Sequence, residues 1–253
     1  MRRFGPVVAV LLLVAGPAAF GQGSITSNNA AYVLKASHWD DTPDVSFTGV
    51  GNGNQLYEAG WWFRIEGDTR ETVFPPPTTQ DYTASIARIS WADLGGRGLS
   101  VTKTHTLLDL GPGRGVVTTT LSVTNNGSGP ITLHLFQMID LDVNGSAAGD
   151  SVAPGGRTIR VTDATAGYCE WRSDEAISYL VLPYGASAGV AALLRDTAVT
   201  NFDNTGVPFG PGDFTGGQQW TLYLSPGASG TVHVNVACNM TLVPVTLQTF
   251  QVD

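Results

Sequence analysis

LSVTKTHTLLDLGPGRGVVTTTLSVT, residues 99–124, contains two runs in which apolar and polar side chains alternate. Such alternation is typical of strands with one buried face, because successive side chains of a strand point to opposite faces of the sheet. Gly111-Pro112-Gly113 lies between the two runs, and glycine accepts the positive φ angles of tight turns. The stretch therefore predicts two long antiparallel strands joined by a hairpin turn.

The same pattern recurs along most of the chain. Short alternating runs are separated by Gly, Pro and Asn, and no window of a dozen residues keeps apolar side chains at helical spacing without interruption. About thirteen strands are expected, including Ile131–Val143 and Val190–Leu194. Residues 125–128 and 225–227 are expected to close further hairpins. We therefore predict an all-β fold, a large antiparallel β-sandwich formed by a single domain over residues 24–243.

Composition and charge exclude several classes of protein. The chain has 253 residues with 31 Gly and 14 Pro, and only 13% of the residues are charged. These proportions exclude a coiled coil and a helical repeat array. The formal net charge of −8 disfavours phosphate backbones and anionic lipid, so no nucleic-acid partner is expected.

The two ends of the chain have compositions of their own. Residues 1–23 are predicted to be a secretory signal peptide, because Arg2 and Arg3 precede a short apolar stretch and a region of small residues. No segment has the roughly 18 consecutive apolar residues of a membrane helix, so no membrane span is expected. Residues 244–253 are expected to form a C-terminal extension. The predicted location is secreted, that is, periplasmic or extracellular.

Cys169 and Cys238 are the only cysteines of the chain. An even number of cysteines in an exported protein predicts a disulfide, here one that closes a loop of 69 residues. The alternative is a pair of buried free thiols within strands.

A run of acidic side chains that begins at Asp140 has the spacing D-x-D-x-N-G. Alternating oxygen ligands followed by glycine match the first half of a calcium loop. Position twelve is Ser151 instead of the bidentate Glu, and the run follows a predicted strand, so an EF-hand is excluded. A looser structural Ca²⁺ site is one hypothesis, and a plain turn with solvent-facing aspartates is the alternative. The expected ligands of that site are Asp140, Asp142, Asn144 and Asp150.

A second group of residues combines aromatic rings with charges. Rings can stack on the apolar faces of sugars while carboxylates and guanidinium groups bind the hydroxyls, so these residues are candidates for glycan contact. The alternative is that the rings pack in the core and the charges form structural ion pairs. The predicted ligand-binding residues are Trp61, Trp62, Arg64, Glu66 and His134.

Local catalytic motifs give little support for an enzyme. The sequence has no H-E-x-x-H zinc helix, no G-x-x-x-x-G-K-[ST] phosphate loop and no C-x-x-C pair. A glycosidase needs two carboxylates at a set separation, and these can come from distant strands. An enzyme is therefore less expected than a binding protein.

Several segments resemble those of a group of uncharacterised exported bacterial β-sandwich proteins that often carry a C-terminal surface-sorting tail. The similarity extends roughly from Tyr32 to Val236, and it implies a large antiparallel β-sandwich of the galactose-mutarotase-like kind, with no assigned activity. Residues 244–252 resemble the opening of such a tail, and no anchor is expected after them. The segments that carry the resemblance are residues 56–64, 67–71, 121–125, 135–142, 219–222 and 226–227.

These observations predict an exported, non-catalytic module of the cell surface, structural or adhesive, that contacts a glycan. Its expected partner is a polysaccharide or another surface component. The alternative is a carbohydrate-active enzyme, such as a mutarotase-like protein, a glycosidase or a lyase, whose acids converge on one sheet face.

Overall fold

A computed structural model describes residues 23–34, 44–47, 54–153, 155, 157–164, 167–185 and 187–239, with the backbone alone for residues 44–47. The predicted signal peptide up to residue 22 and the predicted C-terminal extension lie outside these ranges. No helix among the described residues is long and apolar enough to cross a membrane.

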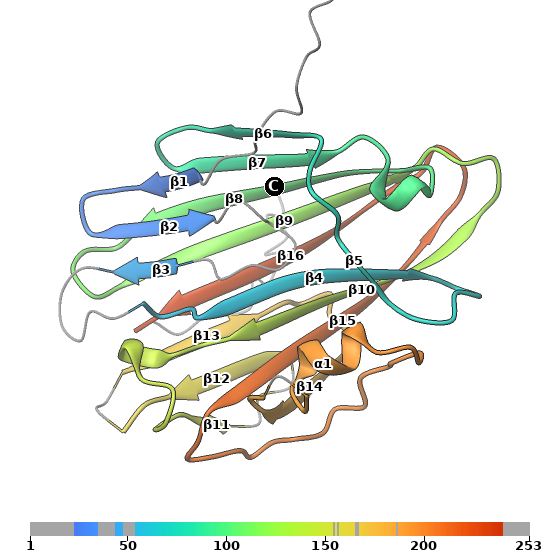
Figure 1. Cartoon of the computed structure of the whole chain (residues 1–253). Coiled ribbons are helices and arrows are strands. Elements are labelled where there is room, and N and C mark those ends of the chain that lie inside the picture. The colour runs from blue at the N-terminus through green and yellow to red at the C-terminus, as the bar shows by residue number, and fades with distance from the viewer. Residues whose placement is uncertain are drawn as a thin grey trace, which may run out of the picture.

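The regular secondary structure of the described chain is nearly all antiparallel sheet (Figure 1). The large sheet has eight strands in the spatial order β11 (Ser151–Ala153), β12 (Thr158–Thr162), β13 (Tyr168–Arg172), β16 (Ser229–Cys238), β9 (Gly115–Asn125), β8 (Leu99–Asp109), β7 (Ile86–Trp91) and β6 (Thr79–Tyr82). The second sheet has the order β14 (Ser178–Pro183), β15 (Phe214–Leu224), β10 (Ile131–Asp140), β4 (Glu58–Ile65) and β5 (Thr72–Val73). The third consists of β1 (Gly23–Thr26), β2 (Ala30–Leu34) and β3 (Asp44–Phe47).

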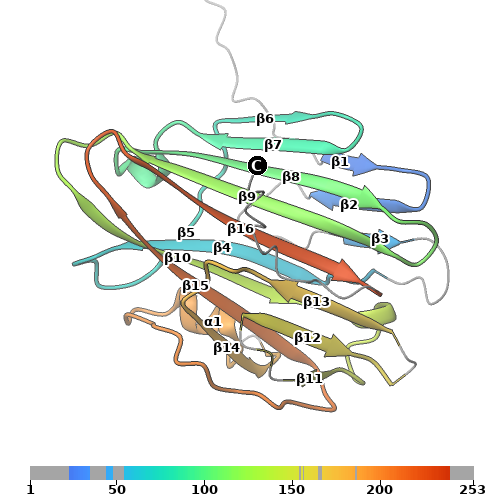
Figure 2. The ribbon, with the colours of Figure 1, turned by 180° about the vertical axis from the view of Figure 1, so that it is seen from behind.

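The two large sheets pack face to face, and their facing side chains form the main core. Figure 2 shows the sandwich from behind, with the strands of the eight-stranded sheet nearest the viewer. Trp61 of β4 stacks on Trp220 of β15 with ring centroids 5.4 Å apart, and Trp171 of β13 faces them from the other sheet within the same cluster. The three-stranded sheet joins this core next to β7 and β8 through Ile25 and Tyr32. The predicted all-β sandwich is therefore confirmed.

The stretch that predicted the fold forms a hairpin as expected. β8 and β9 pair in antiparallel register from Leu99 opposite Asn125 to Asp109 opposite Gly115. Gly111 and Gly113 at the turn have φ angles of +97° and +72°, which only glycine adopts without strain.

The hairpins predicted at residues 125–128 and 225–227 are wrong, because the strands on either side of each turn do not pair with each other. β9 ends at Asn125 in the eight-stranded sheet, whereas β10 begins at Ile131 in the five-stranded sheet. The turn at residues 225–227 likewise connects β15 in one sheet to β16 in the other. Both turns carry the chain across the sandwich, because turn chemistry reverses the chain without fixing which sheet the next strand joins.

The predicted strand Val190–Leu194 is also wrong, because these residues form the short helix α1 (Val190–Arg195). The helix packs against β15, β14 and β5 on the outer face of the five-stranded sheet. Its Val190 and Leu194 join a second apolar cluster there with Trp62 and Phe136. The run is apolar on one side because it covers this outer face.

The disulfide prediction is confirmed. Cys169 of β13 and Cys238 of β16 lie directly opposite each other in the register of the two strands, and their sulfur atoms are bonded. The bond fixes β13 to the centre of the eight-stranded sheet.

Candidate functional site

Three aspartates from separate segments converge at one end of the five-stranded sheet. Asp140 is the last residue of β10, Asp142 precedes the 3₁₀ turn η2 (Val143–Gly145), and Asp213 immediately precedes β15. The antiparallel register of β10 and β15 pairs Ile139 with Gly216, and its continuation brings Asp142 opposite Asp213. One carboxylate oxygen from each of the three aspartates lies within 4.8 Å of the other two.

Backbone hydrogen bonds hold these segments in place. The N–H of Tyr57 donates to the carbonyl of Asp140 at 2.9 Å, and the N–H of Tyr184 donates to the carbonyl of Asp213 at 3.0 Å. The N–H of Gly212 donates to the carbonyl of Asp150 at 2.9 Å, which places Asp150 beside the same loop. These backbone hydrogen bonds therefore fix the positions of the segments that carry the acidic side chains.

The structure places the four predicted calcium ligands as follows. Asp140 and Asp142 lie together, and Asp150 borders them as a buried side chain. Asn144 has a φ angle of +62° in η2, and its side-chain amide lies against Gly167, where an added Cβ would be 2.2 Å from Nδ2. The new member is Asp213, which the sequence did not single out.

Burial and mutual repulsion make the carboxylates of this group hard to ionise. Burial, followed by the neighbouring Asp142 carboxylate, raises the pKa of Asp140 to about 9. The same two causes raise the pKa of Asp150 to about 8, and burial together with Asp213 raises the pKa of Asp142 to about 6. Neither oxygen of Asp140 has a hydrogen-bond partner among the described residues, whereas the backbone N–H of Val143 partly offsets the rise in the pKa of Asp150. Such groups need either a proton or a cation.

Two exposed tyrosines lie beside the acids. The rings of Tyr57 and Tyr184 meet edge to face with centroids 5.9 Å apart, and the two residues are 45% and 40% exposed. Partial burial, followed by the hydrogen bond with Tyr57, raises the pKa of Tyr184 to about 12. The two rings therefore present aromatic surface next to the carboxylates.

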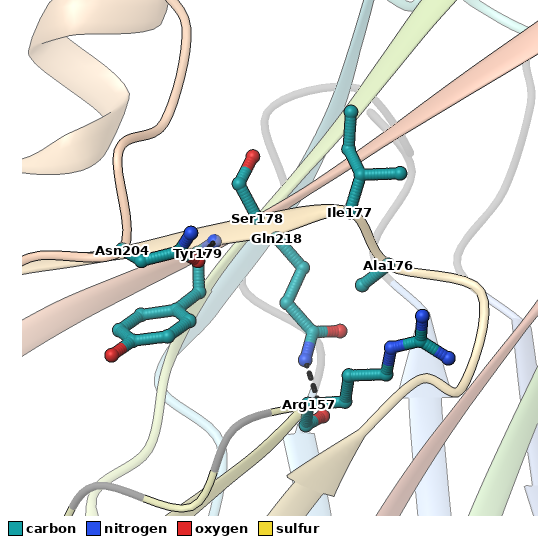
Figure 3. Close-up of a pocket in the computed structure, with 7 residues that line it drawn as sticks. All are labelled: Arg157, Ala176, Ile177, Ser178, Tyr179, Asn204 and Gln218. Carbon is teal, nitrogen blue, oxygen red and sulfur yellow. Dashed lines mark hydrogen bonds between the residues drawn. The ribbon is translucent and has the colours of Figure 1, made fainter.

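A separate pocket of about 270 Å³ opens beside the edge strand β14 (Figure 3). Gln218 of β15 is fully buried, and its Nε2 donates to the carbonyl of Arg157 at 3.1 Å. Tyr179 lies opposite Gln218 in the register of β14 and β15, and its N–H donates to Asn204 Oδ1 at 3.1 Å. In Figure 3, Gln218 lies between the Tyr179 ring on one side and the Arg157 side chain on the other. The lining residues are Arg157, Ala176, Ile177, Ser178, Tyr179, Asn204 and Gln218.

The residues around the pocket include both hydrogen-bond donors and a hydrogen-bond acceptor. Arg157 and Asn204 are exposed, and Arg157 forms no ion pair with a carboxylate among the described residues. The guanidinium of Arg157 is oriented by a hydrogen bond to the carbonyl of Asp174. Gln218 Oε1 is buried and lacks a described hydrogen-bond partner. Donors, one acceptor and an aromatic ring therefore meet around a small cavity.

The structure buries both predicted tryptophans. Trp61 is 3% exposed in the main core, and Trp62 is 1% exposed beneath α1, with the Arg195 guanidinium 5.7 Å from its ring centroid. Because neither ring has an open face, the structure offers no stacking surface at these two positions. Their placement agrees with the alternative that the rings pack in the core.

The three predicted polar residues form pairs on the outer face of the five-stranded sheet. Arg64 Nε lies 3.5 Å from Glu71 Oε1, and both side chains are buried. The other pair joins His134 Nε2 to Glu66 Oε2 at 2.8 Å, which lowers the pKa of Glu66. Arg64 also donates to Asn201 Oδ1 at 2.7 Å. These contacts match the structural ion pairs that the sequence left open.

Residues 185–189 read GASAG and have the G-x-S-x-G spacing of a nucleophile elbow. They follow β14 and precede α1, which is the strand-to-helix context of that motif. Ser187 is exposed, but no histidine or carboxylate among the described residues is hydrogen bonded to its hydroxyl. Among the residues that the structure describes, no base is therefore placed to activate this serine.

Comparisons with solved structures identify the fold. The structure is similar to a bacterial glucoamylase solved with acarbose, with a TM-score of 0.59 and 11% identity over 93% of this chain. This chain spans only 35% of that glucoamylase. A galactose mutarotase-like protein from Lactobacillus casei ATCC 334 gives a TM-score of 0.53 and 9% identity, covering 87% of this chain and 100% of that one. A protein from Synechocystis sp. PCC 6803 gives a TM-score of 0.55 at 10% identity, and the match covers 86% of this chain and 95% of that one.

These similarities show that the chain has the galactose-mutarotase-like β-sandwich fold. No protein-family model matches the sequence, and no characterised protein matches it. At identities near 10%, the comparisons establish the fold alone.

Proposed function

We propose that this protein is an exported, non-catalytic carbohydrate-binding module whose sugar site is the pocket beside β14. The observation that carries the proposal is the meeting of the Tyr179 ring, the Arg157 guanidinium and the buried Gln218 amide around about 270 Å³. That volume is just below the roughly 300–1,000 Å³ of pockets for drug-sized ligands, so it suits a single sugar unit. The fold supports a carbohydrate ligand, because the similar structures include a glucoamylase and a galactose mutarotase-like protein.

Each side chain has a defined part in the proposed complex. The Tyr179 ring packs against the C–H face of the sugar, where an aromatic side chain contributes apolar contact. Arg157 and the exposed Asn204 amide donate hydrogen bonds to hydroxyl oxygens. Gln218 lies beneath the pocket, where its Nε2 donates to the carbonyl of Arg157 and so positions the segment that carries the guanidinium.

Export is part of the same proposal. The Cys169–Cys238 disulfide supports it, because such bonds persist in oxidising compartments. The charged and apolar start of the sequence supports it as well. In this view a polysaccharide of the cell surface or its surroundings is the partner.

The second candidate is a carbohydrate-active enzyme, and one observation favours it. Asp142 is half-buried, and its raised pKa of about 6 would let it hold a proton near neutral pH, as a general acid must. The neighbouring carboxylates also fit the binding module, because one oxygen each from Asp140, Asp142 and Asp213 lies within 4.8 Å of the other two, an arrangement that suits a shared cation.

Replacing Tyr179 by alanine should weaken sugar binding about tenfold, because the ring contributes on the order of 1.4 kcal/mol of contact. Arg157→Gln should have a similar effect through the loss of charged hydrogen bonds. Isothermal titration of residues 24–253 with mono- and disaccharides measures both changes. Tyr223→Ala is the matched control, since Tyr223 is 80% exposed and lies outside the pocket. Unchanged affinity in both pocket variants would contradict the proposed site.

A further inference from the structure

We propose that Asp140, Asp142 and Asp213 bind one Ca²⁺ ion at the end of the five-stranded sheet. The geometry supports this directly, since one oxygen of each carboxylate lies within 4.8 Å of the other two. Two ligands of one Ca²⁺ ion can be at most about 4.6–5.2 Å apart, because each Ca–O distance is about 2.3–2.6 Å. All three oxygens can therefore reach a common ion. This site is separate from the sugar pocket and does not depend on it.

Asp140 is buried without a described hydrogen-bond partner, which is a second and independent indication of a cation. It is 1% exposed, and neither of its oxygens has a hydrogen-bond partner among the described residues. Asp150 next to the group is equally buried. Protein interiors rarely leave such groups unsatisfied, so each one requires an explanation. A cation between the carboxylates supplies it.

No basic side chain in the described part of the chain takes that place. Among the described residues, no Lys, Arg or His forms an ion pair with Asp140, Asp142, Asp150 or Asp213. The described basic residues that do form ion pairs contact other carboxylates, such as Arg97 with Asp68 and Arg160 with Glu170. No described basic side chain therefore neutralises these aspartates, and a bound cation would do so.

The ligand chemistry selects the ion. All three ligands are carboxylates, and the group contains no His or Cys, which disfavours Zn²⁺ and Cu²⁺. Hard oxygen ligands suit Ca²⁺ and Mg²⁺, but Mg²⁺ requires near-ideal octahedral geometry and retains most of its water. Ligands from one strand end, from the residue before a 3₁₀ turn and from one loop form an irregular set, which Ca²⁺ tolerates better. Water molecules would complete its six to eight ligands.

The bound ion would have a structural role. It would join the end of β10 to the start of β15 and hold η2 beside them. The carbonyl of Asp213 also accepts the N–H of Tyr184, so the ion would stiffen the connection that follows β14. The Tyr57 and Tyr184 rings next to the site would then lie on a fixed surface.

Thermal unfolding of residues 24–253 after chelation and dialysis tests this proposal. Addition of 5 mM CaCl₂ at pH 7.5 should raise the Tm by about 5 °C or more, by mass-action stabilisation of the folded state. Asp142→Asn and Asp213→Asn should each remove most of this rise. Asp81→Asn, at an exposed aspartate of β6, should keep all of it.

A second measurement keeps the proposal testable if the variants fold poorly. Tb³⁺ added to the wild-type protein should give luminescence sensitised by nearby aromatic rings, and Ca²⁺ should displace it with a stoichiometry of one per chain. The proposal is overturned if Ca²⁺ changes neither Tm nor Tb³⁺ luminescence, or if Mg²⁺ acts as strongly as Ca²⁺. Because no sugar is present, failure here leaves the proposed sugar site unaffected.

Discussion

Replacing both Cys169 and Cys238 by alanine should lower the free energy of unfolding by roughly 4 kcal/mol. The cross-link closes a loop of 69 residues, and its loss restores the entropy of that loop to the unfolded chain. Both residues are fully buried and directly opposite each other, so the folded state also loses packing at the join of β13 and β16. Urea denaturation followed by tryptophan fluorescence measures the change.

The control for this prediction is chemical reduction. Dithiothreitol should destabilise the wild-type protein by a similar amount and leave the double variant unchanged. A difference of less than about 1 kcal/mol between the wild-type protein and the double variant would contradict a structural role for this bond.

In the absence of divalent cations, raising the pH from 5 to 8 should destabilise the protein by roughly 2–4 kcal/mol. The pKa of Asp140 is raised from 3.8 to about 9 by burial and by Asp142, with further contributions from Asp213, Glu58 and Asp150. The folded state therefore keeps a proton that the unfolded state loses above about pH 4. Stability is then greatest below the pKa of the unfolded state and falls as the pH rises toward 9.

Chemical denaturation in chelator at several pH values measures this dependence. Asp140→Asn should flatten the profile, because an amide does not titrate, and Asp81→Asn should leave it unchanged. Saturating Ca²⁺ should reduce the loss at pH 8, since the ion favours the ionised carboxylates. Stability that increases steadily from pH 5 to 8 in chelator would contradict the buried, unpaired state of Asp140.

The sequence predicted the fold class because alternation is a local property. Residues 99–124 carry the two-residue period and the glycines of their turn, and both appear in the structure. Residues 190–194 do not carry such information, since a short apolar run fits a buried strand or a helix equally well. The pairing after Asn125 was missed for a related reason, because a turn does not show which sheet receives the next strand.

The candidate sites were predictable only in part. Asp140 and Asp142 were found through their spacing, but Asp213 lies 71 residues after Asp142 and joins them only through the register of β10 and β15. The pocket combines Arg157, Tyr179 and Gln218 from separate segments, and no local pattern connects them. Trp62 lies on a strand that the sequence predicts, but its burial depends on α1, a segment that its apolar pattern predicts as a strand.

The central claim is that the protein binds carbohydrate without turning it over. Incubation of residues 24–253 with a panel of soluble and insoluble polysaccharides, with retained protein and released or altered sugar both measured, tests it most directly. We predict retention on at least one polysaccharide, release from it by a small sugar that fills the pocket, and no turnover. Turnover would contradict the account in favour of an enzyme, and the absence of both retention and turnover across the panel would contradict a carbohydrate ligand altogether.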